Sequence, residues 1–397
     1  PLERMGLRRV AQEPSAMKIL TVCYEYPPVG GGGGRVAAQI SRALATRGHE
    51  VRVQTCRTGT LPARETDSSG VDIHRVFSLR RSPDTCSVPE MAAYVALNAI
   101  PVISAARSWR PDVMHVHFAV PTGPVAWLAH QATGVPYVLT AHLGDVPGGA
   151  PEQTDHLFRI VRPVTVPIWR DAAAITAVSS HVAELAQKSY SISPEVIFNG
   201  AESRAAAPTS PDPSGVLRLL FVGRMSIQKN PVFLSEVFRR MRTGNWRATF
   251  IGDGPLRGEL EAALREAGVA DRCHFVGWVD AHTVQKHLGD SDVLLLPSLS
   301  EGLPVAAIEA VTRGLAIAGS DIPGLRDVVI DGENGWLLPS DATAWASALD
   351  AAAANPQDLA RRKAESLRIA GRFDLTKITD QYERVLQRAA GKSVAEK

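Results

Sequence analysis

Apolar residues along the chain fall into two kinds of segment that alternate from one end to the other. Short, nearly continuous apolar runs are typical of strands buried on both faces, and longer segments with an apolar residue every three or four positions are typical of helices that cover such strands. Helical spacing is clear over residues 36–47 and 125–132. The strands expected in the first half are 18–23, 51–55, 71–77, 113–118, 137–141 and 175–178.

A second series of the same kind begins after a stretch rich in Pro, Ser and Ala, AESRAAAPTSPDPSG, which is typical of a linker. Its expected strands are 217–222, 248–251, 274–276, 293–297, 315–318 and 336–338. Two such series predict an α/β protein of two Rossmann-like domains, with parallel sheets whose carboxyl ends face a central cleft. We expect a disordered extension at 1–16, a first domain at 17–203, a linker at 204–214 and a second domain at 215–372.

Composition narrows the class of protein. The 397 residues are 45% hydrophobic and 21% charged, with a net charge of +2, which fits a soluble globular protein and disfavours a dedicated nucleic-acid binder. Cys23, Cys56, Cys86 and Cys273 lie far apart, so we expect reduced, buried thiols and a cytoplasmic protein. The most apolar long segment, 91–109, is interrupted by polar residues and a proline, and the first 16 residues lack the apolar stretch of a signal peptide.

A run of five glycines, in EYPPVGGGGGRVAAQI, follows the first predicted strand. Gly32, Gly34 and Ala37 match the dinucleotide fingerprint G-x-G-x-x-[GA]. However, residues 24–29 separate the glycines from the strand, and the second strand, 51–55, is not followed by the acid that would hold a ribose. Both differences argue against a redox cofactor.

A ligand loop is the favoured interpretation of this glycine run. The run leads directly into a helix with an apolar face, which disfavours a flexible linker. Bare backbone at Gly32, Gly33 and Gly34 lets a ligand approach, and the N–H groups at a helix start favour an anion. Arg35 adds a positive charge. A mobile glycine turn without a ligand is the alternative.

Two cations follow the first strand of the second series, in LLFVGRMSIQKN. Arg224 and Lys229, with Gly223 before them, suit a diphosphate, because Arg binds phosphate oxygens in a fork and Lys acts as a point charge. Gly254 and Gly277 also come directly after predicted strands. They allow close approach to a planar base, although ordinary turns at strand ends explain each of them equally well.

The segment PSLSEGLPVAAIEAVTRG carries two carboxylates around a helix start. Glu301 and Gly302 lie on the entry loop, the helix begins near Pro304, and Glu309 lies about 8 Å farther along the helix axis. The first carboxylate, the free backbone N–H groups at the helix start and the second carboxylate could bind, in that order, a hydroxyl, a diphosphate and a second hydroxyl. Glu301 could instead complement the helix dipole and Glu309 could face solvent, but the helix is otherwise apolar, and a buried carboxylate needs a partner.

These motifs together resemble the family-four retaining glycosyltransferases of GT-B fold. The E-x7-E pattern of that family matches Glu301 and Glu309, and its G-R-x4-K loop matches Gly223, Arg224 and Lys229. The likeness extends from about residue 17 to residue 382. Further similar segments are TAHLGD with His142, AVSS with Ser179, NG at 199–200, GDGP and FVGWV.

The resemblance implies roles for particular residues. Arg224 and Lys229 would bind the donor diphosphate, Glu309 the ribose hydroxyls and Glu301 the transferred sugar, with His142 beside that sugar. A helix at about 373–390 would cross back onto the first domain. The donor site would further include Gly32, Gly33, Gly34, Gly223, Gly254, Val276, Gly277, Gly302, Leu303, Pro304 and Val305, and the acceptor site Tyr26, Arg35, Asp145 and Ser179.

The activity implied is transfer of a hexose from a nucleotide-diphosphate sugar, UDP- or GDP-linked, to a hydroxyl of a glycan, lipid-linked or natural-product acceptor. The sugar nucleotide is a co-substrate, and no tightly bound cofactor or metal is expected. The resemblance also implies front-face attack with retention, so we name no protein nucleophile. Two alternatives stay open, namely a UDP-sugar epimerase and a nucleotide-sugar-binding protein without catalysis.

Three other clusters are assigned no part in the transfer chemistry. Asp290 and Asp292 form a D-x-D before a strand, at the end away from the cleft, and are interpreted as turn and cap residues. His115 and His117 share one side of a strand, but no third metal ligand is evident. Residues 25–35, 77–91 and 141–169 are expected to shape the acceptor site. Within or near them, Arg75, Arg80 and Arg81 with Phe77 could contact anionic lipid head groups in a peripheral membrane contact.

Overall fold

The computed structural model describes residues 16–82, 85–149, 151–202 and 214–392. The chain forms two compact units. The first unit comprises residues 1–140, 162–176 and 379–397, and the second comprises 141–161 and 177–378. The extension and the linker expected at 1–16 and 204–214 fall, apart from Ala16 and Ser214, outside the described residues.

An eight-stranded sheet, ordered β3-β4-β2-β1-β5-β6-β7-β8, carries the first series of strands. The printed pairings are parallel except that between β3 and β4, which is antiparallel. β1 and β5 lie in the middle and are almost entirely buried, as expected of strands covered on both faces. The strands are β1 (Lys18–Val22), β2 (Glu50–Arg57), β3 (Arg64–Thr66), β4 (Asp72–Phe77), β5 (Val113–His117), β6 (Tyr137–Ala141), β7 (Ala174–Ala177) and β8 (Glu195–Val196).

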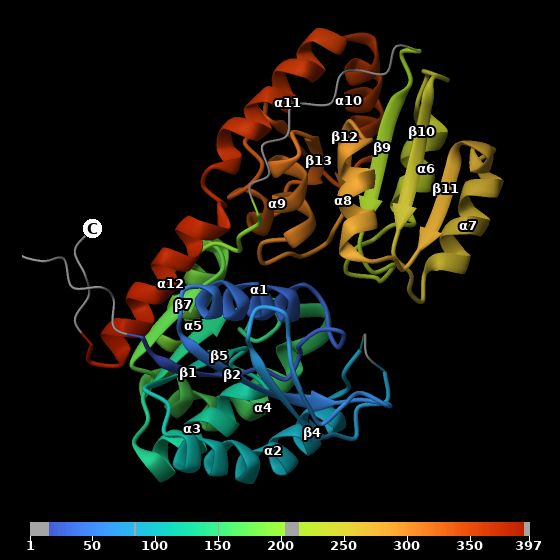
Figure 1. Cartoon of the computed structure of the whole chain (residues 1–397). Coiled ribbons are helices and arrows are strands. Elements are labelled where there is room, and N and C mark those ends of the chain that lie inside the picture. The colour runs from blue at the N-terminus through green and yellow to red at the C-terminus, as the bar shows by residue number, and fades with distance from the viewer. Residues whose placement is uncertain (1–15, 83–84, 150, 203–213, 393–397) are drawn as a thin grey trace, which may run out of the picture. The chain divides into compact units, whose positions relative to one another are not determined.

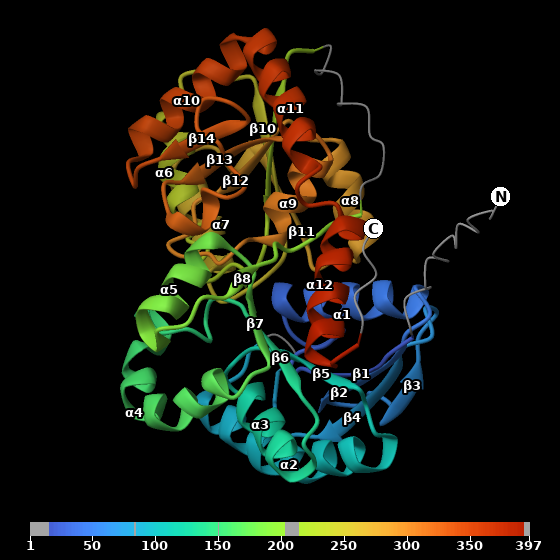
Figure 2. The same ribbon diagram turned by 90° about the vertical axis from the view of Figure 1, so that its left-hand side faces the viewer.

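Helices cover both faces of this sheet within the first unit. α1 (Gly32–Thr46) lies on one face, and α2 (Val88–Trp109) and α3 (Thr122–Thr133) lie side by side on the other (Figures 1 and 2). α12 (Leu375–Ala389) is the helix expected near 373–390, and its part from Thr379 onward belongs to the first unit. There Glu383 accepts hydrogen bonds from Arg47 at 2.7 Å and contacts His49 at 3.1 Å. The remaining helices of the first half are α4 (Pro151–Arg170) and α5 (Ser180–Tyr190).

A six-stranded parallel sheet, ordered β11-β10-β9-β12-β13-β14, forms the centre of the second unit. α6, α7 and α10 cover one face and α8, α9 and α11 the other (Figure 2). The strands are β9 (Leu217–Val222), β10 (Trp246–Ile251), β11 (Cys273–Gly277), β12 (Val293–Leu296), β13 (Ala316–Ser320) and β14 (Gly335–Leu338). The helices are α6 (Phe233–Arg240), α7 (Arg257–Glu266), α8 (Ala281–Gly289), α9 (Val305–Thr312), α10 (Ala342–Ala354) and α11 (Pro356–Ala370).

Aromatic side chains fill a hydrophobic core of this unit. Phe250 of β10 stacks on Phe275 of β11 at 4.9 Å between ring centroids, and Phe238 of α6 packs on Trp246 at 4.6 Å. Trp345 of α10 is fully buried in the same cluster. Burying such rings stabilises the unit through apolar area and through preferred ring geometry. The sheet is therefore a rigid base for the loops that follow its strands.

The predicted α/β architecture is confirmed, and all twelve predicted strands are present within two residues of their expected bounds. β3 and β8 were not predicted, because neither has a continuous apolar run. The glycine run differs from the expected loop, since α1 begins at Gly32 and three of the five glycines form its first turn. The first predicted helix therefore starts four residues earlier than its apolar spacing suggests.

Candidate active site

Loops after four neighbouring strands meet at the carboxyl edge of the six-stranded sheet. Because β11, β10, β9 and β12 are adjacent, the segments that follow them are brought side by side. Backbone hydrogen bonds join these segments, from Gly223 N–H to Ile251 O at 3.0 Å and from Gly252 N–H to Gly277 O at 2.8 Å. The tertiary fold thus unites the predicted residues of the second series around one edge.

Lys229 and Glu301 form a close ion pair at this edge. Lys229 Nζ lies 2.5 Å from Glu301 Oε1, and the hydroxyl of Ser298 donates to the same oxygen at 2.6 Å. The side chains of Lys229 and Glu301 are 22% and 7% exposed, so the pair is largely shielded from water. Two predicted ligand residues therefore neutralise each other in this structure.

The loops that carry this pair are held together by backbone and amide groups. Leu299 N–H donates to Gln228 O at 2.8 Å, and the Gln228 side chain donates to Ser300 O at 2.9 Å. Arg224 lies at the start of the same loop, and its buried Nε has no hydrogen-bond partner within the described residues. A buried guanidinium nitrogen without a partner is costly, and an incoming acceptor such as a phosphate oxygen would satisfy it.

α9 begins beside Glu301. The helix starts at Val305, one residue later than expected, with Pro304 at its N-cap position, and Glu309 is buried at 8% exposure on the second turn. Gly324 packs tightly over the entry loop, because a Cβ at that position would lie 1.8 Å from the carbonyl oxygen of Glu301. Only glycine fits there, so the backbone of Glu301 is held from outside its own loop.

His142 lies in the second unit, directly after β6. The carboxylate of Asp145 accepts a hydrogen bond from the His142 backbone N–H at 2.9 Å, and both residues are buried. A Cβ on Gly302 would lie 3.1 Å from Leu143 Cβ, so this turn packs against the Glu301 loop. Burial lowers the pKa of His142 to about 3, so its imidazole is neutral at physiological pH.

The β10 and β11 ends present a charged and aromatic surface. Arg257 pairs with Asp253 at 2.9 Å and lies 5.7 Å from the ring centroid of Phe275. A Cβ on Gly254 would come within 2.5 Å of Met225 O, so the GDGP turn packs directly against the Arg224 loop. Val276 lies in β11 and Gly277 ends it. These residues border the edge where a flat base could approach the backbone.

The glycine run of the first unit is folded around a carboxylate. Glu25 Oε2 accepts from Gly31 N–H at 3.0 Å, and Glu25 Oε1 accepts from Arg80 at 3.2 Å. Gly30 has φ of +97°, and a Cβ there would lie 2.5 Å from Glu25 Cβ. Glu25 therefore supplies the anion at the Gly31 N–H, next to the glycines at which a ligand was expected. The N–H groups of the first turn of α1 lie beyond it.

The residues predicted for the acceptor have varied surroundings. Tyr26 is buried and Arg35 is half-buried. Ser179 is the N-cap of α5, where its hydroxyl accepts from Val182 N–H at 3.2 Å. Asp145 supports the His142 backbone, as described above. Their assignment to an acceptor site remains a prediction.

Two of the three arginines expected to meet lipid head groups are not on the surface. Arg75 is 4% exposed and pairs with Glu65 at 2.6 Å, and Arg80 is 7% exposed and pairs with Glu25. Desolvating either arginine without its carboxylate would be costly, so the chain buries both as pairs. The reading of these two residues as lipid contacts is therefore wrong, and only Arg81 of the three is exposed.

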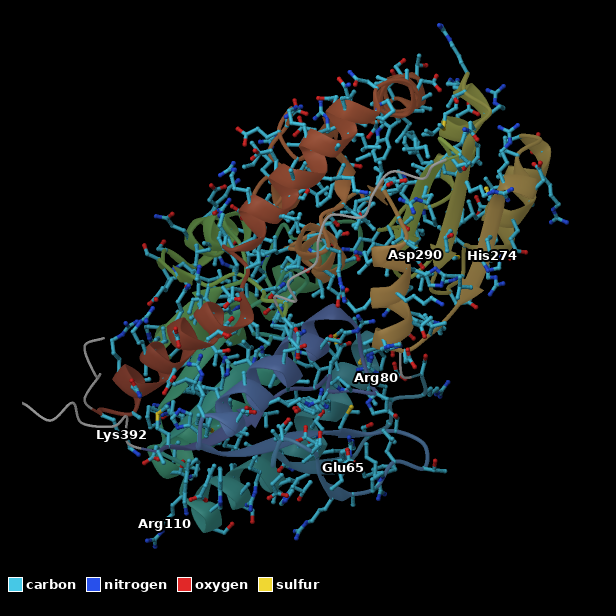
Figure 3. The ribbon with its side chains drawn as sticks, turned by 45° about the horizontal axis from the view of Figure 1, so that its top comes forward. Glu65, Arg80, Arg110, His274, Asp290 and Lys392 are labelled. Carbon is cyan, nitrogen blue, oxygen red and sulfur yellow. The ribbon has the colours of Figure 1, made fainter. Side chains whose placement is uncertain are left out.

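The structure refines the interpretation of the remaining clusters as structural and not functional residues. Asp290 follows α8 as its C-cap (Figure 3), but Asp292 is a buried anchor that binds Arg218 and Lys363, each at 2.8 Å. His115 is buried and bonds to the Thr140 hydroxyl at 2.9 Å. Among the described residues, no group of His, Cys, Asp and Glu side chains could hold a metal ion. All four cysteines are free, two buried and two half-buried.

Several residues of the site were missed by sequence reasoning. Ser298 and Gln228 lie within motifs already singled out, yet only the fold shows that they support Glu301 and its loop. Glu25 precedes the glycines by five residues, and its acidic character in an otherwise apolar strand end was a usable signal. Gly324 lies in SDIPGL, where nothing local indicates its contact with Glu301.

Comparison with known proteins assigns this architecture and site to a class. The family model for glycosyl transferase 4-like domains matches residues 31–200, and the model for glycosyl transferases group 1 matches residues 206–369. With these matches, the two parallel-sheet units are those of a GT-B glycosyltransferase. The chain belongs to the group 1 glycosyltransferases, a family of enzymes that use nucleotide-sugar donors.

Individual relatives match most of the chain. Glycogen synthase of Mycobacterium tuberculosis (strain ATCC 25618 / H37Rv) is 30% identical over 380 residues, covering 90% of this chain and 91% of that protein. The 2-deoxystreptamine N-acetyl-D-glucosaminyltransferase of Streptomyces fradiae is 29% identical, covering 77% of this chain and 78% of that protein.

Solved structures share the fold. Sucrose-phosphate synthase from Thermosynechococcus elongatus superposes with a TM-score of 0.82 at 20% identity, covering 95% of this chain and 100% of that chain. Anabaena Alr3699/HepE in complex with UDP and glucose gives 0.76 at 19% identity, covering 94% and 100%.

Proposed function

We propose that this enzyme is a retaining glycosyltransferase that moves a hexose from a nucleotide-diphosphate sugar to an acceptor hydroxyl. The observation that supports the proposal best is the single edge of the second unit at which Arg224, Lys229, Glu301 and the start of α9 are gathered. The cations suit a diphosphate, and the carboxylates suit sugar hydroxyls. UDP- and GDP-sugars are the donors we favour.

In this proposal the diphosphate recruits Lys229 away from Glu301. The phosphate oxygens satisfy Arg224 Nε, and Lys229 moves from the carboxylate to the diphosphate. Glu301 is then available to accept from hydroxyls of the transferred sugar, while Ser298 continues to hold it. Glu309 binds the ribose. The ion pair thus keeps the two residues ordered before the donor arrives.

The transfer step is a substitution at the anomeric carbon. The bond from C1 to the leaving phosphate oxygen breaks, the acceptor oxygen forms a bond to C1 on the same face, and the acceptor proton goes to the leaving phosphate. Negative charge grows on that phosphate, and Arg224 and Lys229 stabilise it in a shielded site. Neutral His142 would provide a hydrogen bond near the sugar and no additional positive charge.

The acceptor is a hydroxyl of a glycan, a lipid-linked sugar or a natural product. The Mycobacterium tuberculosis and Streptomyces fradiae relatives are named for a glucan and for a small cyclitol acceptor, so the family relationship supports both classes. We place the enzyme in the cytoplasm, since sugar nucleotides are found there and all four thiols are free.

A two-stage experiment tests the proposal. A thermal-shift screen with UDP-, GDP-, ADP- and dTDP-sugars identifies the donor, and NMR of the product with a broad acceptor panel gives the anomeric configuration. We expect retention of configuration, near loss of transfer in Lys229→Ala and weaker donor binding in Glu309→Ala. Full activity in both variants would contradict the site.

The same experiment separates the alternatives. Conversion of the nucleotide sugar to its epimer without an acceptor would favour an epimerase. Donor binding without turnover on any acceptor would favour a binding protein. A thermal shift with NADH but with no sugar nucleotide would contradict the assignment of the donor site.

A further inference from the structure

The outer layer formed by α2 and α3 is almost free of charge. α2 has 22 residues and α3 has 12, and only Glu90 and Arg107 among them carry a charge. Charged residues make up 21% of the whole chain. A helix on the surface of a soluble domain normally turns a charged stripe to solvent, and these two helices lack one. We call this layer the uncharged face.

The exposed side of α2 is apolar. Tyr94, Asn98, Val102 and Ala106 are buried at four-residue spacing and point to the unit's core. On the other side Ile100 is 77% exposed, with further large apolar side chains exposed at Val88 (48%), Leu97 (37%) and Leu128 of α3 (38%). Ile100 is thus the most exposed of these large apolar side chains, and moving it from water into an apolar environment would be favourable.

α2 has the composition of a membrane helix but lies flat on its unit. Within the described parts of the chain it is the one helix that is long and apolar enough to cross a bilayer. Core helices of soluble proteins can pass the same test, but only 22% of its most apolar window is buried. One face of α2 is packed against the sheet, so only its other face is available to a membrane. The helix would therefore lie in the plane of the membrane–water interface and not cross the bilayer.

Arginines surround the uncharged face. Arg81 precedes α2, and Arg107 and Arg110 lie at its C-terminal end, all three exposed. Figure 3 shows Arg110 projecting outward at the lower edge of the first unit. Arg170, at the end of α4, has a side chain that is 73% exposed. The face is therefore apolar in its middle and cationic at its ends.

The nearby carboxylates are already engaged. Glu90 accepts from the backbone N–H groups of Ser87 and Arg81, at 2.7 and 2.9 Å. Asp171, beside α3, accepts from the Trp127 indole at 2.9 Å and from Arg170 at 3.1 Å. Neither acid neutralises Arg107 or Arg110, so the rim keeps a net positive charge.

We propose that the uncharged face docks on a bilayer that contains anionic lipids. Ile100 and Leu97 would enter the acyl boundary, and the arginines would meet phosphate head groups. A second copy of the chain fits less well, since two such faces would oppose rims on which, among the described residues, the arginines outnumber the carboxylates. This surface differs from the buried pair Arg75 and Arg80, and the proposal does not depend on the donor or acceptor.

Vesicle co-sedimentation of the full chain tests the proposal. We expect binding to vesicles of phosphatidylcholine with 30% phosphatidylglycerol, little binding to pure phosphatidylcholine, and release at 0.5 M salt. The double variant Leu97→Glu, Ile100→Glu should reduce partitioning by about tenfold or more, given roughly 0.8 kcal/mol for each buried CH₂. Circular dichroism should show that the variant is folded.

Two further variants sharpen the result. Arg107→Gln with Arg110→Gln should reduce partitioning about fivefold per arginine. Ile227→Glu, a matched change at a 65% exposed side chain of the second unit, should leave partitioning unchanged. Equal binding of wild type and the Leu97, Ile100 variant would overturn the proposal. So would a wild-type dimer that the same variant dissociates, if no vesicle binding accompanies it.

Discussion

Replacing Glu301 by glutamine separates the two roles proposed for the Lys229–Glu301 pair. The substitution keeps the shape of the side chain and an oxygen for Ser298 but removes the charge that holds Lys229 at 2.5 Å. A nucleoside diphosphate then no longer competes with a carboxylate for the lysine. We therefore expect the variant to bind the diphosphate more tightly and yet to transfer sugar more slowly.

The size of the effect follows from the contact. A hydrogen bond to a charged group contributes about 1.5–3 kcal/mol. Lys229 is 22% exposed, so solvent weakens the pair and the lower end of that range applies. About 1.5 kcal/mol corresponds to roughly tenfold in a dissociation constant. The gain should shrink as salt is raised, because the remaining attraction to the diphosphate is screened.

Isothermal titration calorimetry with the nucleoside diphosphate of the best donor measures this directly. Glu309→Gln is the matched control, since it makes the same chemical change in the same site but at the residue assigned to the ribose. We expect the Kd to fall for Glu301→Gln and to rise for Glu309→Gln. If Glu301→Gln binds the diphosphate no more tightly than wild type, the exchange of Lys229 between carboxylate and phosphate is refuted.

Three further predictions concern stability and protonation. Asp292→Ala should cost about 3–5 kcal/mol, because Lys363 is left charged with its side chain 2% exposed. That lowers Tm by roughly 10 °C, and adding Lys363→Met should restore most of it; an unchanged Tm in calorimetry would contradict this. His142, whose pKa is about 3, should give neutral-imidazole NMR shifts at pH 5, and a charged ring there would contradict the burial argument. Since its pKa falls below the ordinary 6.5, its contribution to stability is full above that pH and declines towards pH 3. Gly30→Ala should cost about 1–3 kcal/mol in denaturant titrations, because φ is +97° and the new Cβ meets Glu25, whereas alanine at a helical glycine of the same run should cost less.

The strand pattern and the main donor motifs could be read from the sequence because they depend on neighbouring residues. A buried parallel strand must be apolar on both faces, so a largely apolar run of three to seven residues was enough to predict each of the twelve strands. Glu301 and Glu309 lie on one short helix and its entry loop, so their spacing alone indicated paired carboxylates. Gly223, Arg224 and Lys229 likewise lie within seven residues.

Contacts between segments far apart in the sequence could not be predicted from local sequence patterns. Lys229 meets Glu301 across 72 residues, and Arg80 meets Glu25 across 55, so neither ion pair could be inferred from spacing. Arg75 and Arg80 look like surface cations in the sequence, because charged residues are mostly exposed. Pairing with carboxylates is what allowed the fold to bury them.

The sequence by itself determined the class of fold, the order of its strands along the chain and the residue types at the proposed donor edge, because apolar periodicity and short motifs act over a few residues. Tertiary structure decided which charges are neutralised, which glycines are helical and which apolar helix stays exposed. Those properties depend on the order of strands in the sheet and on the packing of distant segments, which no local pattern encodes. The motif thus predicts Lys229 as a donor ligand, and only the fold shows that it pairs with Glu301.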